Sequence, residues 1–319
     1  MILVIGEALI DLIGRGSEQY EAVVGGANAN VAVALAVRGE KQAFLGRISS
    51  DGFGQLIRSH LLASGVNLDY SVRAEEQTSL AVANIDDSGV ASYSFYLNGT
   101  ADWGWQDHEF LPETKLRELN VSAIQFGCLG MALEPGSSKI LSWLTGIHTK
   151  NEITLSHDLN IRPALGLEKD LELERVLRIN DISHIIKASD ADVEWLYGTS
   201  DAEKLEAIFQ EWSRQKLVVI TRGGDGVSLY RNQLRVDVPG FQAKVQDTVG
   251  AGDTFIANFL SELRKFDALG ENPQKRLEQL DQDKLIYAAR FANAAAALVC
   301  ERIGCEPPRI ELVVEKLKD

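Results

Sequence analysis

Basic charge, cysteine and long apolar runs are all scarce in this sequence of 319 residues. It has 32 lysines and arginines against 46 acidic residues, and the formal net charge of -14 provides no positive field for nucleic acid or anionic membranes. No apolar stretch approaches the length of a membrane-spanning helix. The opening MILVIGEALIDL lacks a basic segment and reaches Glu7 and Asp11 too early for a signal peptide. We therefore expect a cytoplasmic protein that binds small molecules and neither nucleic acid nor membranes.

Several familiar site signatures are missing as well. Cys128, Cys300 and Cys305 form neither a disulfide framework nor a CxxC metal pair, which fits a reducing compartment. There is no GxxxxGK[ST] phosphate loop, no GxSxG nucleophile elbow and no HExxH zinc motif. GAGDTF starts like GxGxxG but has Phe255 in place of the third glycine. These absences remove the common nucleotide-loop, hydrolase and dinucleotide interpretations.

What the sequence does contain is an alternation of strand and helix patterns. Near-continuous apolar runs such as ILVIGEALI, QAFLGRI and KLVVI predict strands of a parallel sheet covered on both faces. Amphipathic segments such as DGFGQLIRSHLLASG, with Gly65 as a stop, predict the helices between them. GVSLYR and QLRVDVPG predict a hairpin near the end of this series. The fold class we expect is α/β, with three layers (α/β/α) around a central, mostly parallel sheet.

The alternation breaks between residues 70 and 100. TSLAVANI, a DDSG turn and VASYSFYL have the pattern of an antiparallel hairpin in a small sheet. We interpret this sheet as a lid formed mainly by about residues 12–24 and 70–105. No repeat, low-complexity tract or long linker interrupts the chain, so residues 1–319 are expected to form a single domain.

The stretch DTVGAGDTF, residues 247–255, carries the chemistry that the sequence predicts most directly. Apolar residues after Asp253 recur at helical spacing, so Gly250 to Asp253 form the first turn of a helix with a buried face. Free N–H groups at such a turn stabilise negative charge, and the helix dipole should keep an aspartate there ionised. This pairing predicts phosphoryl transfer to a hydroxyl, with Asp253 accepting the proton. Taken alone, however, GAGD is more often a tight turn with an aspartate cap.

A second long motif accompanies it. The stretch VGGANANVAVALAVRGEKQAFLGRISSDGFG resembles the N-terminal signature of the ribokinase-like sugar kinases, the phosphofructokinase B group, and DTVGAGDTF resembles their C-terminal signature. The resemblance covers nearly the whole chain and implies a ribokinase-like fold that transfers the ATP γ-phosphate to a sugar. It also implies that Asp253 is the catalytic base and that Gly250, Ala251 and Gly252 form the anion hole.

The resemblance also implies a sugar site. Its predicted members are Asp11 in GEALID, the glycine pair Gly25 and Gly26, and Asn30. Carboxylate and amide side chains hold hydroxyls, while glycines let a sugar approach the backbone. HDLNIRPAL resembles the DxNxR stretch of the family, which would direct Asn160 to the sugar and Arg162 to both the sugar and the phosphate. A surface arginine paired with a glutamate is the alternative for Arg162.

The nucleotide side is implied in the same way, with one departure. Where the family has NxxE, this chain has Ser189 and Asp192, so a water-mediated Mg²⁺ contact replaces a direct one in our expectation. Asp247 matches a position that supports a monovalent cation such as potassium in some relatives. Asn293 corresponds to the adenine pocket, with a packed polar residue of an alanine-rich helix as the alternative. The remaining predicted ATP residues are Lys187, Thr221, Gly223, Gly224 and Gly226.

The sequence of the predicted lid ranks the candidate sugar substrates. SFYLNGTADWGW resembles fructokinases, in which an Ala-Asp pair follows the aromatic lid strand, as Ala101 and Asp102 do here. Leu97 stands where many relatives carry an arginine, which disfavours an acidic sugar. The predicted order is therefore fructose, then 2-keto-3-deoxygluconate, then ribose or a nucleoside. Trp103 and Trp105 either cover the sugar or pack in the core, and the second is the more frequent fate.

Two further expectations concern class and assembly. A non-catalytic sugar-binding or regulatory protein with the same fold is the alternative from another class, and ADP release in the presence of sugar separates the two. An exposed lid sheet with aromatic residues needs a cover, which predicts a homodimer joined lid to lid.

Overall fold

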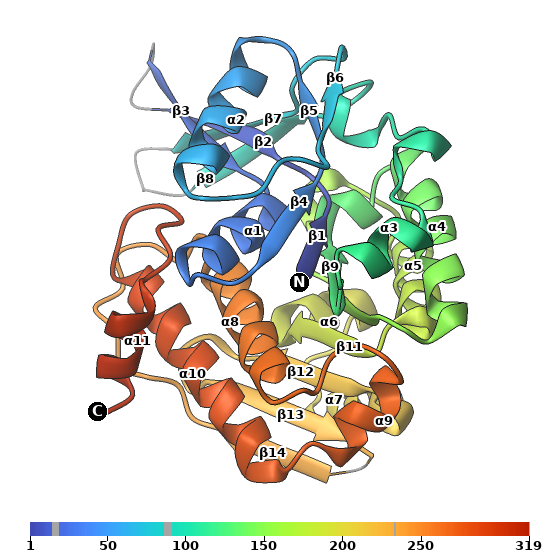
Figure 1. Cartoon of the computed structure of the whole chain (residues 1–319). Helices are drawn as coiled ribbons and strands as arrows, with labels where there is room; N and C mark the ends of the chain where they lie inside the picture. The colour runs from blue at the N-terminus through green and yellow to red at the C-terminus, as the bar shows by residue number, and fades with distance from the viewer. Residues whose placement is uncertain (15–18, 86–90, 233, 319) are drawn as a thin grey trace.

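The computed structural model describes residues 1–14, 19–85, 91–232 and 234–318. Its main sheet has eight strands in the order β14-β13-β12-β11-β10-β9-β1-β4 (Figure 1). The strands from β4 to β12 in this order are parallel, whereas β13 and β14 form an antiparallel hairpin at one edge. Their bounds are β1 Ile2–Ile5, β4 Gln42–Leu45, β9 Ala123–Gly127, β10 Thr154–Asp158, β11 Ile185–Ser189, β12 Leu217–Thr221, β13 Val227–Arg231 and β14 Leu234–Val238. The expected mostly parallel sheet with its late hairpin is confirmed.

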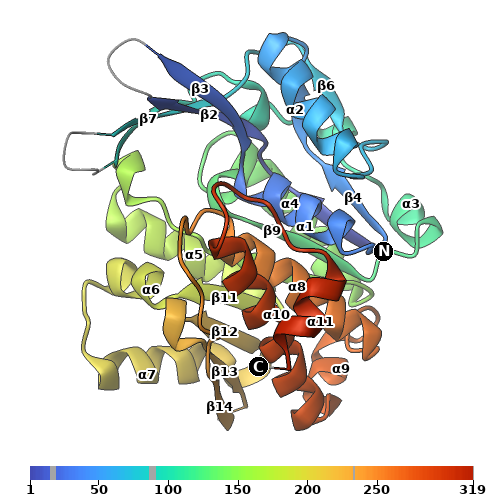
Figure 2. The ribbon, with the colours of Figure 1, turned by 90° about the vertical axis from the view of Figure 1, so that its left-hand side faces the viewer.

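Helices cover both faces of this sheet and complete three layers (Figures 1 and 2). Strand β1 shows why, because Ile2 and Val4 pack with the helices of one layer and Leu3 and Ile5 with those of the other. One layer holds α1 Ala27–Val37, α8 Ala251–Lys265, α9 Pro273–Gln279 and α10 Gln282–Cys300. The other holds α3 Glu113–Glu118, α4 Gly136–Lys150, α5 Lys169–Ile182, α6 Asp190–Tyr197 and α7 Ala202–Trp212. Helix α11 Ile310–Lys316 packs on α10.

The lid is a second sheet above one end of the main body (Figure 1). Its strand order is β3-β2-β7-β8, with bounds β2 Leu9–Gly14, β3 Tyr20–Gly25, β7 Leu80–Ile85 and β8 Ala91–Tyr96. The hairpin β7–β8 is antiparallel as expected, but β2 and β7 are parallel, so the lid sheet is mixed. The DDSG turn lies at residues 86–89, outside the described residues. Beside the lid lie α2 Gly52–Ala63 and the small parallel pair β5 Arg47–Ser49 with β6 Val72–Ala74.

Two runs that the sequence predicts as single strands are each divided between two sheets. ILVIGEALI breaks at Gly6, whose φ is +154°, so β1 lies in the main sheet and β2 in the lid. QAFLGRI is divided at Gly46, with β4 in the main sheet and β5 in the small parallel pair. Hydrophobic periodicity cannot detect these breaks, because both halves of each run are apolar. The lid therefore begins at Leu9, earlier than the expected boundary near residue 12.

Two helices and two tryptophans can be compared with the sequence predictions. Helix α1 is buried as predicted, and helix α9 is an element that the sequence analysis does not anticipate. Trp103 and Trp105 are buried, and Trp105 stacks on Phe110 within the main body, which confirms the packing interpretation. No helix in the part of the chain that the structure describes is long and apolar enough to cross a membrane.

Candidate active site

The GAGD turn forms the N-terminus of α8, as the sequence predicts. Gly250 is the N-cap residue with φ +76°, and a Cβ there would lie 2.1 Å from Cys305 Sγ, so the position requires glycine. A Cβ on Gly252 would lie 2.8 Å from Lys187 Nζ. The first turn of a helix leaves N–H groups without intrahelical partners. This turn therefore combines backbone donors with a nearby ammonium group, an arrangement that favours an anion.

Asp253 is the third residue of this helix and does not cap it, since the N-cap position belongs to Gly250. Its side chain is directed to α1, where Asn30 Nδ2 donates to Asp253 Oδ2 at 2.8 Å. Asp253 is 6% exposed, and burial raises its pKa, while the hydrogen bond from Asn30 and the charges of Lys187 and Arg162 act to lower it. The expectation that the helix dipole keeps this carboxylate ionised is thus incomplete, because burial outweighs the groups that favour the charged form. A raised pKa suits a group that must accept a proton.

Lys187 reaches this turn from the main sheet. It lies on β11 opposite Asp158 of β10, and Nζ donates to both Asp158 oxygens at 2.9 and 2.7 Å. Both side chains are buried. Burial raises the pKa of Asp158 to about 6, although Lys187 acts to lower it. The ion pair keeps the ammonium beside Gly252, where it can meet a phosphate.

Two of the predicted sugar residues, Asp11 and Gly25, lie together on neighbouring strands of the lid. Asp11 lies on β2, and a Cβ on Gly25 of the neighbouring strand would lie 2.1 Å from Asp11 Oδ2. Burial raises the pKa of Asp11 to about 6, and the Arg162 guanidinium acts to lower it. Since Arg162 also lowers the pKa of Asp253, its charge lies near both carboxylates. Asn160, two residues earlier, adopts a left-handed φ of +42° in the loop after β10.

Two lid residues predicted to contact the sugar, Ala101 and Asp102, have polar groups bound to the protein itself. Asp102 is buried, and its oxygens accept from the Ala8 N–H at 2.9 Å and from the Ser79 hydroxyl. The carbonyl of Ala101 accepts from Arg47 Nε at 2.9 Å. These bonds hold the connection between body and lid, and direct sugar contacts by Ala101 and Asp102 stay predictions.

The ATP residues predicted around β11 and β12 have mixed positions. Ser189 and Asp192 form a capping box on α6, and the Asp192 oxygens accept from the Ile161 N–H at 2.9 Å and the Ser189 N–H at 2.8 Å. These bonds are a structural use that the sequence analysis does not assign. In the loop after β12, Gly223 and Gly226 have φ of +50° and +97°, and the space beside Gly224 is open. Thr221, the last residue of β12, donates to the Ala188 carbonyl at 3.4 Å.

Asn293 and Asp247 hold backbone segments near the turn. Asn293 Nδ2 donates to the carbonyls of Val238 and Pro239, which supports the packed polar residue of the alanine-rich helix. Asp247 accepts from the Val249 N–H at 3.1 Å and from the Gly304 N–H at 2.9 Å. Across the described ranges, no group of three or more His, Cys, Asp or Glu side chains could hold a metal ion. Potassium and adenine contacts at these residues stay predictions.

Sequence reasoning misses two buried carboxylates beside this site. Glu7 is fully buried and accepts from Asn28 and Gly130, and Asp158 binds Lys187. A charged residue within the apolar run LVIGEALI is the signal that could have identified Glu7, because a buried charge needs partners. Asp158 begins the DLNIR stretch, but its partner lies 29 residues away in sequence.

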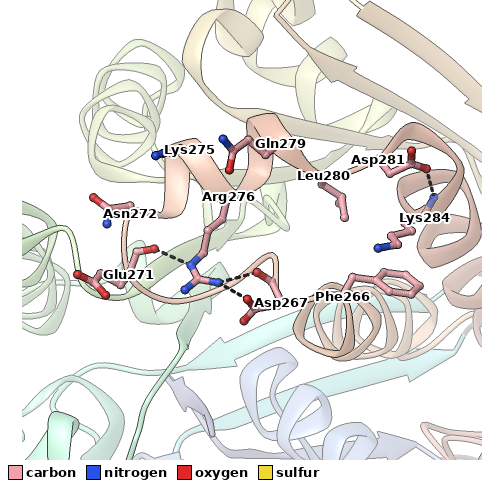
Figure 3. Close-up of a pocket in the computed structure, with 10 residues that line it drawn as sticks. All are labelled: Phe266, Asp267, Glu271, Asn272, Lys275, Arg276, Gln279, Leu280, Asp281 and Lys284. Carbon is pink, nitrogen blue, oxygen red and sulfur yellow. Dashed lines mark hydrogen bonds and ion pairs between the residues drawn. The ribbon is translucent and has the colours of Figure 1, made fainter.

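A cavity of about 380 Å³ lies elsewhere, between the end of α8, α9 and the start of α10 (Figure 3). Its charged lining residues balance in sign, with Asp267, Glu271 and Asp281 against Lys275, Arg276 and Lys284. Arg276 is already bound to the Glu271 carbonyl and to Asp267. None of the predicted site residues lines this cavity, so its size does not make it the active site.

Known proteins resemble this chain in sequence and in fold. A family model described as pfkB family carbohydrate kinase matches residues 1–311. A fructokinase of Rhizobium leguminosarum bv. trifolii is 34% identical over 294 residues, which are 89% of this chain and 85% of that protein. The crystal structure of a Xylella fastidiosa fructokinase with bound ATP has a TM-score of 0.86 and 26% identity, covering 99% of this chain and 98% of its own. The structure of a Vibrio cholerae O395 fructokinase with fructose, ADP and a calcium ion has a TM-score of 0.82 and 25% identity, covering 99% of this chain and 98% of its own.

Proposed function

The chain belongs to the pfkB family of carbohydrate kinases, and on that premise we propose that it is an ATP-dependent fructokinase. Membership of a kinase family supports catalysis over the non-catalytic alternative. The observation that carries the proposal is the position of Asp253, which lies buried at an anion-binding helix N-terminus and contacts Asn30. A proton acceptor directly beside a phosphate position is what transfer to a hydroxyl requires.

On the acceptor side, the proposed sugar ligands are Asp11, Asn30 and the backbone at Gly25 and Gly26. Asp253 takes the proton of the attacking sugar hydroxyl while the oxygen of that hydroxyl bonds to the γ-phosphorus of ATP. The bond from Asn30 orients the Asp253 carboxylate toward the acceptor. Proton removal in the transition state contributes roughly a hundredfold to ten-thousandfold in rate.

On the donor side, the N–H groups at the start of α8 and the ammonium of Lys187 surround the transferred group. Arg162 adds a second cation, whose charge acts to lower the pKa of both Asp253 and Asp11. These fixed donors stabilise the charge that spreads over the phosphoryl oxygens as the bond to ADP breaks. Thr221 and the loop at 223–226 are proposed to hold the rest of the nucleotide, with open space beside Gly223 and Gly224 and with Gly226 packed against the Val238 carbonyl.

Mg²⁺ fits this site as an ion bound through the phosphates of ATP and not directly through carboxylates of the protein. The oxygens of Asp158 accept from Lys187, and those of Asp192 accept from backbone N–H groups. A magnesium ion bound mainly through phosphates and water is consistent with these engaged carboxylates. When bound, it supplies charge neutralisation for the phosphates, with Asp192 as a water-mediated contact.

Fructose is the acceptor that the site and the relatives support best. Leu97 lies in an apolar cluster with Leu9, Ala81 and Trp103, so the lid offers no cation there for a sugar carboxylate. The Rhizobium leguminosarum relative is a fructokinase, and the Vibrio cholerae structure contains fructose. 2-Keto-3-deoxygluconate and ribose remain the competing acceptors.

A coupled assay of ADP release tests this assignment. Purified protein receives ATP and Mg²⁺ with fructose, ribose, 2-keto-3-deoxygluconate or adenosine. We expect fructose to have the highest kcat/KM by at least about tenfold, because unpaired polar groups in the site disfavour a misfit sugar. A higher kcat/KM for the acidic sugar would overturn the substrate, and no ADP release with any acceptor would overturn the kinase.

We further propose that residues 1–319 form one kinase domain that pairs lid to lid in a homodimer. Tyr20 on β3 and Tyr96 on β8 are exposed, and these are the edge strands of the lid sheet. Edge strands with exposed aromatic side chains favour a covering partner. Light scattering should give twice the mass of one chain at micromolar concentration, and a monomer would contradict the proposal.

The proposed compartment is the cytoplasm. Cys128, Cys300 and Cys305 are free thiols, and burial raises the pKa of each. Unpaired cysteines fit a reducing environment, where ATP is also present. Fractionation of cells that produce the protein should recover it with cytoplasmic markers.

A further inference from the structure

Glu7 lies in the short connection between β1 of the body and β2 of the lid, and the mechanism above does not use it. It is 0% exposed. Its Oε2 accepts from Asn28 Nδ2 at 2.9 Å and from the Gly130 N–H at 3.0 Å, and its Oε1 accepts from the Asn28 N–H at 3.4 Å. One carboxylate thus joins the connection, the start of α1 and the turn after β9.

Asn28 completes this junction. Its Nδ2 donates to the Gly127 carbonyl at 3.1 Å as well as to Glu7. The surrounding backbone packs closely on this junction, because a Cβ on Gly6 would lie 2.2 Å from Asn28 Nδ2, and one on Gly130 would lie 3.3 Å from Glu7 Oε2. Buried polar groups that are satisfied in this way hold a single geometry.

The junction is directly connected to the acceptor site. Asn28 precedes Asn30 by two residues on α1, and Asn30 binds the proposed base Asp253. Gly26, the N-cap residue of α1, lies against the backbone of Glu7, since a Cβ there would be 2.7 Å from the Glu7 carbonyl oxygen. The three segments lie side by side where β1, β9 and α1 meet (Figure 1). A shift at Glu7 therefore moves the sugar-binding glycines and Asn30 together.

We propose that Glu7 and Asn28 are positioning residues for the sugar acceptor, which they serve by fixing the start of α1 against the end of β9. The inference rests on the proposed sugar site. It assigns the pair to the acceptor and not to ATP, whose predicted ligands come from β11, β12 and the loops that follow them. The expected signature is a rise in the KM for fructose without a matching rise in the KM for ATP.

The test compares two substitutions of nearly equal size. Glu7→Met removes the acceptor, so Asn28 Nδ2 and the Gly130 N–H lose their shared partner. Glu7→Gln retains one oxygen that can accept both bonds made to Oε2 and gives up only the longer one from the Asn28 N–H. We expect Glu7→Met to raise the KM and the calorimetric Kd for D-fructose by at least about tenfold, and Glu7→Gln by less than about threefold, with the KM for ATP within about twofold of the parent in both.

Glu172→Met is the matched control. Glu172 is also a buried carboxylate, but it pairs with Arg175 on α5, away from the acceptor site. It should lower the Tm without changing the Kd for fructose. If Glu7→Met does not fold, Asn28→Ala removes the bonds to Glu7 Oε2 and Gly127 and should still raise the Kd for fructose by about threefold or more.

Three results would overturn the positioning role: equal effects of Met and Gln at position 7, a parallel rise in both KM values, or the same loss of fructose affinity in Glu172→Met. The proposed function fails separately. A parent protein that binds fructose without releasing ADP would refute the kinase proposal, and the calorimetric Kd values would still decide the role of Glu7. A parent that binds no fructose would refute both.

Discussion

Replacing Asp253 with asparagine separates the proton acceptor from every other role of this residue. The substituted side chain keeps the shape, and its amide oxygen can accept the bond from Asn30 Nδ2, which is 2.8 Å long in the parent. The loss is therefore confined to proton acceptance, which is worth about a hundredfold or more in rate, or roughly 3 kcal/mol or more in the barrier. We expect kcat to fall by that factor in the coupled assay, with fructose affinity nearly unchanged.

Stability provides the control. Burial raises the pKa of Asp253, so folding disfavours its ionised form, and a neutral asparagine avoids this effect. The Tm of Asp253→Asn at about pH 8 should equal or exceed that of the parent. Asp253→Ala instead leaves Asn30 Nδ2 without its partner and should cost about 1 kcal/mol as well as activity. The mechanism is wrong if folded Asp253→Asn retains more than about a tenth of the parental kcat with saturating fructose and ATP.

Three further predictions test the surroundings of this base. Asn30→Ala removes a hydrogen bond that lowers the pKa of Asp253, so the acid limb of the pH profile of kcat should move to higher pH. An acid limb at the parental pH would show that Asn30 does not influence the protonation of Asp253. Gly252→Ala places a Cβ 2.8 Å from Lys187 Nζ and should raise the KM for ATP at least about tenfold, whereas an unchanged KM would mean that no phosphate occupies the turn. Burial raises the pKa of Asp102 from 3.8 to about 7, so the folded protein holds this proton more tightly, and the resulting stability is lost as the pH rises through about 7. The side chain of Asp102→Asn cannot ionise, so the Tm of this variant should fall less than that of the parent between about pH 5 and pH 8. Equal decreases in Tm would contradict a raised pKa of Asp102.

Local patterns in the sequence predict much of the framework. The apolar stripe after Asp253 predicts α8, and the amphipathic segment ending at Gly65 predicts α2. Both predictions succeed because a helix repeats within its own residues, so its period is visible without knowledge of its neighbours. The chemistry expected of the GAGD turn follows in the same way, since a helix N-terminus and its dipole are local properties.

The sequence does not show where one strand leaves a sheet and the next joins another. LVIGEALI is apolar almost throughout, and only the backbone at Gly6 separates β1 from the lid strand β2. No local pattern predicts the buried bonds of Asp102 to the Ala8 N–H and the Ser79 hydroxyl either, because they join segments distant in sequence. Periodicity reports which faces are buried but not what buries them.

By itself, then, the sequence determined the α/β alternation, the helix N-terminus with its carboxylate, and the two signatures that indicate a sugar kinase. Tertiary structure alone decided which partner each buried carboxylate meets. Lys187 pairs with Asp158 across neighbouring strands, Asn30 with Asp253 across two helices, and Glu7 with Asn28 beneath the lid. Each pair joins residues distant in sequence, and burial together with a partner sets the protonation and orientation of a carboxylate. Those properties exist only after the segments pack together.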